Sequence, residues 1–216
     1  WSLEDSFNKH GLVMKRGFLL YGPPGSGKTS FLILLSNFVI NNGGVVVSVD
    51  DPNLAKIGLR AIRSVEPKRH IVCIIEDIDS HVSDPESEAA WLSLIDGDSN
   101  INRIVFVATT NHPENLSQRF LNRPSRFDHI VHIGMPSSAS RRKYISIKVP
   151  DLPDDKLEEW VSKTEGFSFA HLRELITAVL VLGHDFDETV SRLSSMPKKR
   201  YRSKNKTELG FVHEAV

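Results

Sequence analysis

Residues 22–29 read GPPGSGKT, a complete G-x-x-x-x-G-K-[ST] pattern of a phosphate-binding loop. An apolar run at 17–21 precedes the loop, and an apolar helical pattern that begins at Ser30 follows it. A strand, a glycine-rich turn and a helix in this order aim free backbone N–H groups at a phosphate. We therefore expect Lys28 to reach the β- and γ-phosphates and the Thr29 hydroxyl to bind Mg²⁺. The predicted nucleotide-binding residues are Gly22, Pro23, Pro24, Gly25, Ser26, Gly27, Lys28, Thr29 and Ser30.

The composition is that of an ordinary folded chain. Of the 216 residues, 40% are hydrophobic and 25% are charged, which is enough to build a buried core. The formal net charge is zero, so overall electrostatics favour neither nucleic acid nor a membrane surface as a partner. No apolar stretch approaches the roughly 20 residues of a membrane-spanning helix. The single cysteine, Cys73, favours a reducing, cytoplasmic compartment. Because the chain begins at Trp1, we expect it to be part of a longer protein.

Apolar runs and helical patterns alternate along the first two thirds of the chain. The five runs that predict buried strands are 17–21, 44–49, 71–75, 104–108 and 129–133. The helical patterns between them are 30–41, 52–64, 86–95 and 116–121. This alternation predicts an α/β fold, a parallel sheet between two layers of helices.

Beyond Pro136 only helical patterns are present. They cover 140–148, 153–164, 170–183 and 187–194. We therefore predict an α/β nucleotide-binding domain over 1–136 and a small helical lid subdomain over 137–196. Six of the nine residues at 198–206 are basic, and we expect a basic, disordered tail over 197–216.

Polar side chains follow the third and fourth predicted strands. Glu76 and Asp77 come directly after the run 71–75, and Asn111 follows the run 104–108. Neighbouring parallel strands end at the same edge of a sheet, so we expect these side chains to lie together. Glu76 is predicted to hold Mg²⁺ and Asp77 to polarise the attacking water. Asn111 is predicted to contact that water or the γ-phosphate.

Two arginines, Arg123 and Arg126, lie three residues apart in the segment 120–128. Their planar, permanently charged side chains suit the charge that develops in phosphoryl transfer. The sequence alone leaves open that they are surface residues or pair with Asp128. The nine histidines show no metal-binding spacing.

Together these motifs resemble the AAA+ ATPases, specifically the AAA clade, over residues 7–183. The residues that carry the resemblance are KRGFLLYGPPGSGKTSF at 15–31, LIDG at 94–97, Asn111, RPSRFD at 123–128 and GFSFAHL at 166–172. Within the clade, the loop flanks and the order Glu76-Asp77 are most similar to the branch containing the mitochondrial Rieske-protein translocase.

The resemblance implies Mg²⁺-dependent ATP hydrolysis by a ring oligomer, a hexamer in many relatives, that remodels or translocates a protein substrate. It also implies that Asn111 is a sensor residue and that Arg123 and Arg126 are arginine fingers for the neighbouring subunit. A nucleotide-gated switch with little hydrolysis, a DNA-acting motor and a small-molecule kinase are the alternatives. Three features depart from the family pattern: the order Glu76-Asp77, the lack of a pore-loop aromatic after residue 50, and Phe169 and His171 in the lid motif.

Overall fold

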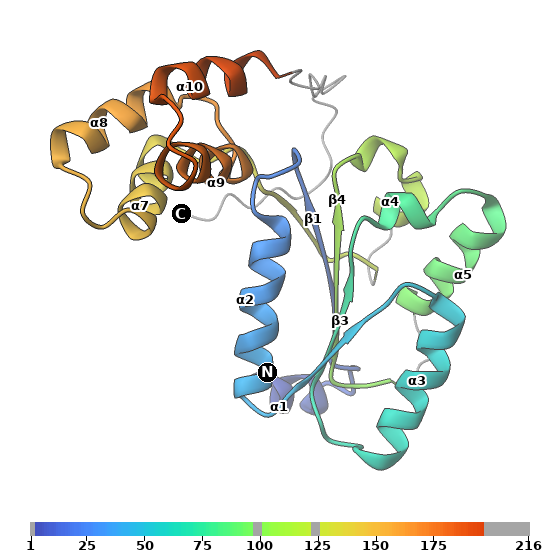
Figure 1. The fold of residues 1–216 in the computed structure, drawn as a ribbon. Helices are drawn as coiled ribbons and strands as arrows, with labels where there is room; N and C mark the ends of the chain where they lie inside the picture. The colour runs from blue at the N-terminus through green and yellow to red at the C-terminus, as the bar shows by residue number, and fades with distance from the viewer. Residues whose placement is uncertain (1–2, 97–100, 122–125, 197–216) are drawn as a thin grey trace. The chain divides into compact units, whose positions relative to one another are not determined.

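The computed structural model describes residues 3–96, 101–121 and 126–196. They form two compact units, shown in Figure 1. Of the described residues, the first contains 3–22 and 28–132, and the second contains Pro23–Gly27 together with 133–196. The predicted domain boundary at residue 136 stays a prediction, and the predicted tail lies outside the described residues.

The first unit is built on a five-stranded sheet. Its strands are β1 (Lys15–Tyr21), β2 (Val45–Ser48), β3 (Ile71–Ile75), β4 (Ile104–Thr110) and β5 (His129–His132). Their order is β2-β3-β4-β1-β5, and every pairing is parallel. The predicted parallel sheet is therefore confirmed, and all five strands end at the same edge.

Helices cover both faces of this sheet. They are α1 (Glu4–Lys9), α2 (Lys28–Asn41), α3 (Pro52–Val65), α4 (Ile78–His81), α5 (Pro85–Asp96) and α6 (Gln118–Leu121). Figure 1 shows α2 on one side of the sheet and α3 with α5 on the other. The start of α3 follows from its sequence: the Asp51 carboxylate accepts the N–H groups of Asn53 and Leu54 at 2.8 Å, and Pro52 fits the first turn.

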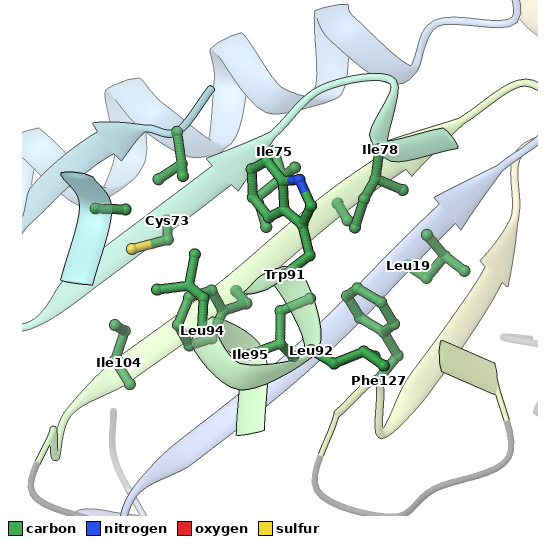
Figure 2. Packing of buried hydrophobic residues seen from close by; sticks show 14 of the residues in the cluster. Leu19, Cys73, Ile75, Ile78, Trp91, Leu92, Leu94, Ile95, Ile104 and Phe127 are labelled. Carbon is green, nitrogen blue, oxygen red and sulfur yellow. The ribbon is translucent and has the colours of Figure 1, made fainter. Parts of the chain in front are cut away.

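The core of the first unit lies between the sheet and α5. Trp91, Leu94 and Ile95 of α5 belong to one buried cluster with Ile75 of β3 and Leu19 of β1 (Figure 2). Each such side chain contributes about 1.5–3 kcal/mol by leaving water. The buried thiol in this cluster has its pKa raised to about 12, because burial disfavours the thiolate, so Cys73 acts as a small apolar residue.

The second unit is helical beyond the loop residues. Its helices are α7 (Ser138–Lys148), α8 (Asp154–Lys163), α9 (Phe169–Ile176) and α10 (Phe186–Ser195), with a π-helical turn over Thr177–Val181. Ile145, Trp160, Leu172 and Leu193 form the centre of its own apolar cluster. The helical segments predicted beyond Pro136 are confirmed. None of the helices in the described ranges has the length and apolar character needed to cross a bilayer.

Gly17 marks a close approach between β1 and the segment before β5. A Cβ at this position would lie 1.7 Å from the carbonyl oxygen of Arg126. The Gly17 N–H donates to the Asp128 carboxylate at 3.0 Å, and the Arg16 guanidinium lies 3.6 Å from the same carboxylate. Only glycine leaves room for this backbone contact.

We predict that Gly17→Ala lowers the free energy of unfolding by about 3 kcal/mol or more, because β1 and the Arg126 carbonyl must separate. Gly58→Ala is the matched control, because Gly58 lies inside α3 and a Cβ there meets no atom within 4 Å. The control substitution should raise stability by about 0.5–1 kcal/mol. Urea denaturation measures both, and equal stabilities for the two variants would contradict the account.

Candidate functional site

Five predicted site residues meet at the edge of the sheet where the strands end. The Lys28 ammonium donates to the Asn111 side-chain oxygen at 2.7 Å, and the Asn111 amide donates to the Asp77 carboxylate at 3.2 Å. The Thr29 hydroxyl donates to the Glu76 carboxylate at 2.9 Å. Residues that follow β1, β3 and β4 therefore form a polar cluster of two hydrogen-bonded sets, Lys28–Asn111–Asp77 and Thr29–Glu76. They lie far apart in the sequence, and the parallel strand order brings them together.

Lys28 is the first residue of α2 and is only 7% exposed. Its ammonium also donates to the Gly22 carbonyl at 2.8 Å. Burial lowers the pKa of Lys28 from its ordinary value, while the carboxylates of Asp77 and Asp79 act in the opposite direction. A compact positive charge held at this point is suited to bind the phosphates of a nucleotide.

Glu76 and Asp77 face different partners. Glu76 contacts the Thr29 hydroxyl, whereas the Asp77 carboxylate contacts Asn111. A carboxylate and a hydroxyl are the hard oxygen ligands that Mg²⁺ prefers. Across the described part of the chain, no group of three or more His, Cys, Asp or Glu side chains is arranged to hold a metal. The pair Thr29 and Glu76 fits Mg²⁺ in the way usual for nucleotide sites, where phosphate oxygens and waters complete the coordination.

The glycines of the loop adopt backbone conformations that other residues avoid. Gly22, Gly25 and Gly27 have φ angles of 153°, 76° and 112°. Within the second unit, a Cβ on Gly25 would lie 2.7 Å from the Ser168 hydroxyl oxygen. The loop therefore requires glycine at Gly25 both for its conformation and for space.

The remaining predicted loop residues differ in exposure. Ser26 is buried, and among the described residues its hydroxyl has no hydrogen-bond partner, although its N–H donates to the Pro23 carbonyl at 3.3 Å. Pro24 and Ser30 are exposed. The Ser26 hydroxyl is thus a buried polar group at the turn of the loop.

Arg126 is buried within the first unit. It is 4% exposed, and its Nε and Nη2 atoms donate to the two carboxylate oxygens of Asp96 at 2.9 and 2.8 Å. Its Nη1 atom donates to the Arg119 carbonyl. The structure thus brings Arg126 to the end of α5 and not to the polar cluster. Service as an arginine finger would require these bonds to break, and that role stays a prediction. Arg123 lies outside the described residues.

Sequence reasoning missed two hydroxyls that support the cluster. Thr109 and Thr110, the last residues of β4, are buried and contact the segment 77–79. The Thr109 hydroxyl accepts the Asp77 N–H, and the Thr110 hydroxyl donates to the Asp79 carboxylate. The sequence pattern that could have revealed them is an apolar strand that ends in two hydroxyl residues directly before Asn111.

Comparison with known proteins finds one matching family model and several distant relatives. A family model described as "ATPase family associated with various cellular activities (AAA)" matches residues 18–135. The ATP-dependent zinc metalloprotease FtsH 1 of Sphaerobacter thermophilus is 29% identical over an alignment of 247 residues, which covers 98% of this chain and 37% of that protein. The ATPase family gene 2 protein of Schizosaccharomyces pombe is 29% identical over 196 residues, covering 80% of this chain and 23% of that protein.

A third relative, Protein SAV of Sulfolobus acidocaldarius, is 28% identical and matches 82% of this chain and 25% of its own length. The chain therefore spans between 23% and 37% of the length of these relatives.

We predict that Arg126→Ala lowers the free energy of unfolding by about 2–3 kcal/mol, because the Asp96 carboxylate loses a bidentate partner that is buried. Asp96→Asn should have a similar effect, and the double variant should cost less than the sum of the two. Arg119→Ala is the control, because the Arg119 side chain is 62% exposed and we expect its ion pair with Glu88 to contribute less than about 1 kcal/mol. Thermal and urea denaturation of the four variants measure the free energies of unfolding. An unchanged stability for Arg126→Ala would show that the Arg126–Asp96 pair does not stabilise the fold.

Proposed function

Because this chain belongs to the AAA family of ATPases, we propose that it binds ATP with Mg²⁺ and hydrolyses it at the edge of the sheet where β1, β3 and β4 end. The observation that carries the proposal is the hydrogen-bonded series from Lys28 through Asn111 to Asp77, beside the pair Thr29 and Glu76. This arrangement supports three separate roles: Lys28 binds phosphate, Thr29 and Glu76 hold the metal, and Asp77 with Asn111 acts on water.

The proposed mechanism begins with binding of the triphosphate. Backbone N–H groups of residues 22–29 surround the β-phosphate, and the Lys28 ammonium moves from Asn111 and Gly22 to the phosphate oxygens. Thr29 and Glu76 would hold Mg²⁺, which neutralises charge on the β- and γ-phosphates when bound. These contacts orient the γ-phosphate toward Asp77 and Asn111.

Asp77 is the proposed general base. Its carboxylate polarises a water molecule for in-line attack on the γ-phosphorus, and Asn111 holds that carboxylate and the water in line. The bond from phosphorus to the bridging oxygen of ADP breaks as the bond to water forms. ADP and inorganic phosphate are the products, and the proton of the water passes to Asp77.

We further propose that the chain works as part of a ring, because AAA proteins often oligomerise and an arginine from a neighbour can complete each site. Arg123 is the proposed finger; Arg126 was predicted with it but is held by Asp96 in this structure.

The proposed substrate is a macromolecule, preferably a protein, since the net charge of zero does not favour nucleic acid. Similarity to the Rieske-protein translocase branch rests on the loop flanks and the order Glu76-Asp77 and stays a proposal.

Substitutions at Lys28 and Asp77 should separate binding from hydrolysis. Lys28→Ala is expected to lose ATP binding, because the buried positive charge that contacts the phosphates is removed. Asp77→Asn is expected to bind ATP normally and to release phosphate at least about 100-fold more slowly. Asp155→Asn, an exposed carboxylate of α8, is the control for the charge change. Titration with a fluorescent ATP analogue measures binding and a phosphate-release assay measures hydrolysis. Normal turnover by Asp77→Asn would reject Asp77 as the general base.

A shared site makes turnover depend on assembly. Turnover per subunit should rise with protein concentration, and Arg123→Ala should reduce it by about 10³-fold while leaving ATP affinity unchanged. Mixing Arg123→Ala subunits with Lys28→Ala subunits should restore part of the activity, since each type supplies what the other lacks. Concentration-independent turnover by a monomer would contradict the ring.

A further inference from the structure

Asp77 has a backbone conformation that residues with a Cβ rarely adopt. Its φ and ψ angles are 46° and 51°, in the left-handed region. Among the described residues, only Asp77 and Arg103 have a positive φ without being glycine. Strained residues of this kind persist where their surroundings hold them, and they concentrate at functional sites. The groups that hold Asp77 are therefore of interest for the proposed reaction.

Three hydrogen bonds hold the Asp77 backbone. Its N–H donates to the Thr109 hydroxyl oxygen at 3.0 Å. Its carbonyl accepts the Ser80 N–H at 2.8 Å and the Ser80 hydroxyl at 2.7 Å. Ser80 belongs to the same chain segment and moves with it, whereas Thr109 belongs to another strand. Thr109 is thus the external anchor of the Asp77 backbone.

Thr109 is well suited to be a fixed anchor. It is 2% exposed and lies in β4, which pairs with β1 on one side and β3 on the other. The register places Ile75 beside Ala108, so the end of β4 runs next to Glu76 and Asp77. The two residues that follow also contact this segment, with Thr110 donating to Asp79 at 2.6 Å and Asn111 donating to Asp77 at 3.2 Å.

We propose that Thr109 is a positioning residue, which holds Asp77 in the left-handed conformation and thereby keeps its carboxylate against Asn111. The inference rests on the proposed function, in which Asp77 acts on the attacking water. Without the hydroxyl, the Asp77 N–H loses its acceptor, and the backbone relaxes toward an ordinary conformation. The carboxylate then leaves its place, while the loop, Lys28 and the pair Thr29 and Glu76 stay unchanged.

The same geometry accommodates the order Glu76-Asp77. Aspartate tolerates the left-handed region better than most residues, because its short polar side chain can bond to nearby backbone groups. Glutamate at 76 has the longer side chain, which reaches the Thr29 hydroxyl of α2 at 2.9 Å. The reversed order would place the longer side chain at the strained position and the shorter one opposite Thr29.

The test compares Thr109→Val, which keeps the shape and removes the hydroxyl, with Thr109→Ser, which keeps the hydroxyl. Thr109→Val is expected to lower kcat for ATP by roughly 10- to 100-fold, because a small displacement of a reacting group has effects of this size. The dissociation constant for ATP should change by less than about twofold, and Thr109→Ser should recover most of kcat. Thr164→Val is the control, because it removes a buried hydroxyl that donates to the Trp160 carbonyl in the second unit. Its kcat should stay unchanged.

Asp77→Asn, assayed beside these variants, separates two kinds of failure. If Asp77→Asn is inactive and Thr109→Val turns over normally, the positioning role is wrong and the proposed function stands. If Asp77→Asn hydrolyses ATP normally, Asp77 is not the general base and there is no reacting group for Thr109 to position. If the parent chain itself releases no phosphate from ATP, the proposed function is wrong. Loss of ATP affinity in Thr109→Val, without recovery by Thr109→Ser, would show a structural role only. The double variant Glu76→Asp/Asp77→Glu should turn over more slowly than the parent chain, and faster turnover would contradict the explanation of the order.

Discussion

The pairing of β4 with both β1 and β3 is the constraint on which the site depends. β4 lies between the strand that leads into the phosphate-binding loop and the strand that leads into Glu76 and Asp77. The register sets Tyr21 beside Thr110 and Ile75 beside Ala108, so three strand ends lie at the same level. Lys28, Asn111 and Asp77, from distant parts of the sequence, are therefore joined by hydrogen bonds, and Glu76 bonds to the Thr29 hydroxyl beside them.

The segment that enters β5 illustrates how one motif serves the fold. The Arg126 side chain binds Asp96, its carbonyl lies against Gly17, Phe127 is buried, and Asp128 accepts the Gly17 N–H. These contacts join the end of α5, β1 and the start of β5. Each of the three guanidinium nitrogens of Arg126 donates a hydrogen bond within the first unit, so the side chain could serve a neighbouring site only if those bonds broke. We therefore propose Arg123 before Arg126 for the finger role.

Much of this arrangement follows from local sequence rules. The five apolar runs predict the strands, and the rule that parallel strands end at one edge predicts the meeting of Lys28, Glu76, Asp77 and Asn111. The sequence does not predict that Arg126 pairs with Asp96. Asp96 is 30 residues away, and charge alone does not select one carboxylate among many. The left-handed backbone of Asp77 depends on Thr109, which is brought near only by strand pairing. Short elements such as α1 and α4 are too brief to leave a periodic pattern.

The central claim is that this edge of the sheet hydrolyses ATP. The most direct test is steady-state release of inorganic phosphate from ATP by the unmodified chain, measured with Mg²⁺ and after chelation of the metal. The account predicts many phosphates released per subunit with Mg²⁺ and almost none after chelation. Tight ATP binding with no more than one phosphate released per subunit would contradict it, and would describe a nucleotide-gated switch instead.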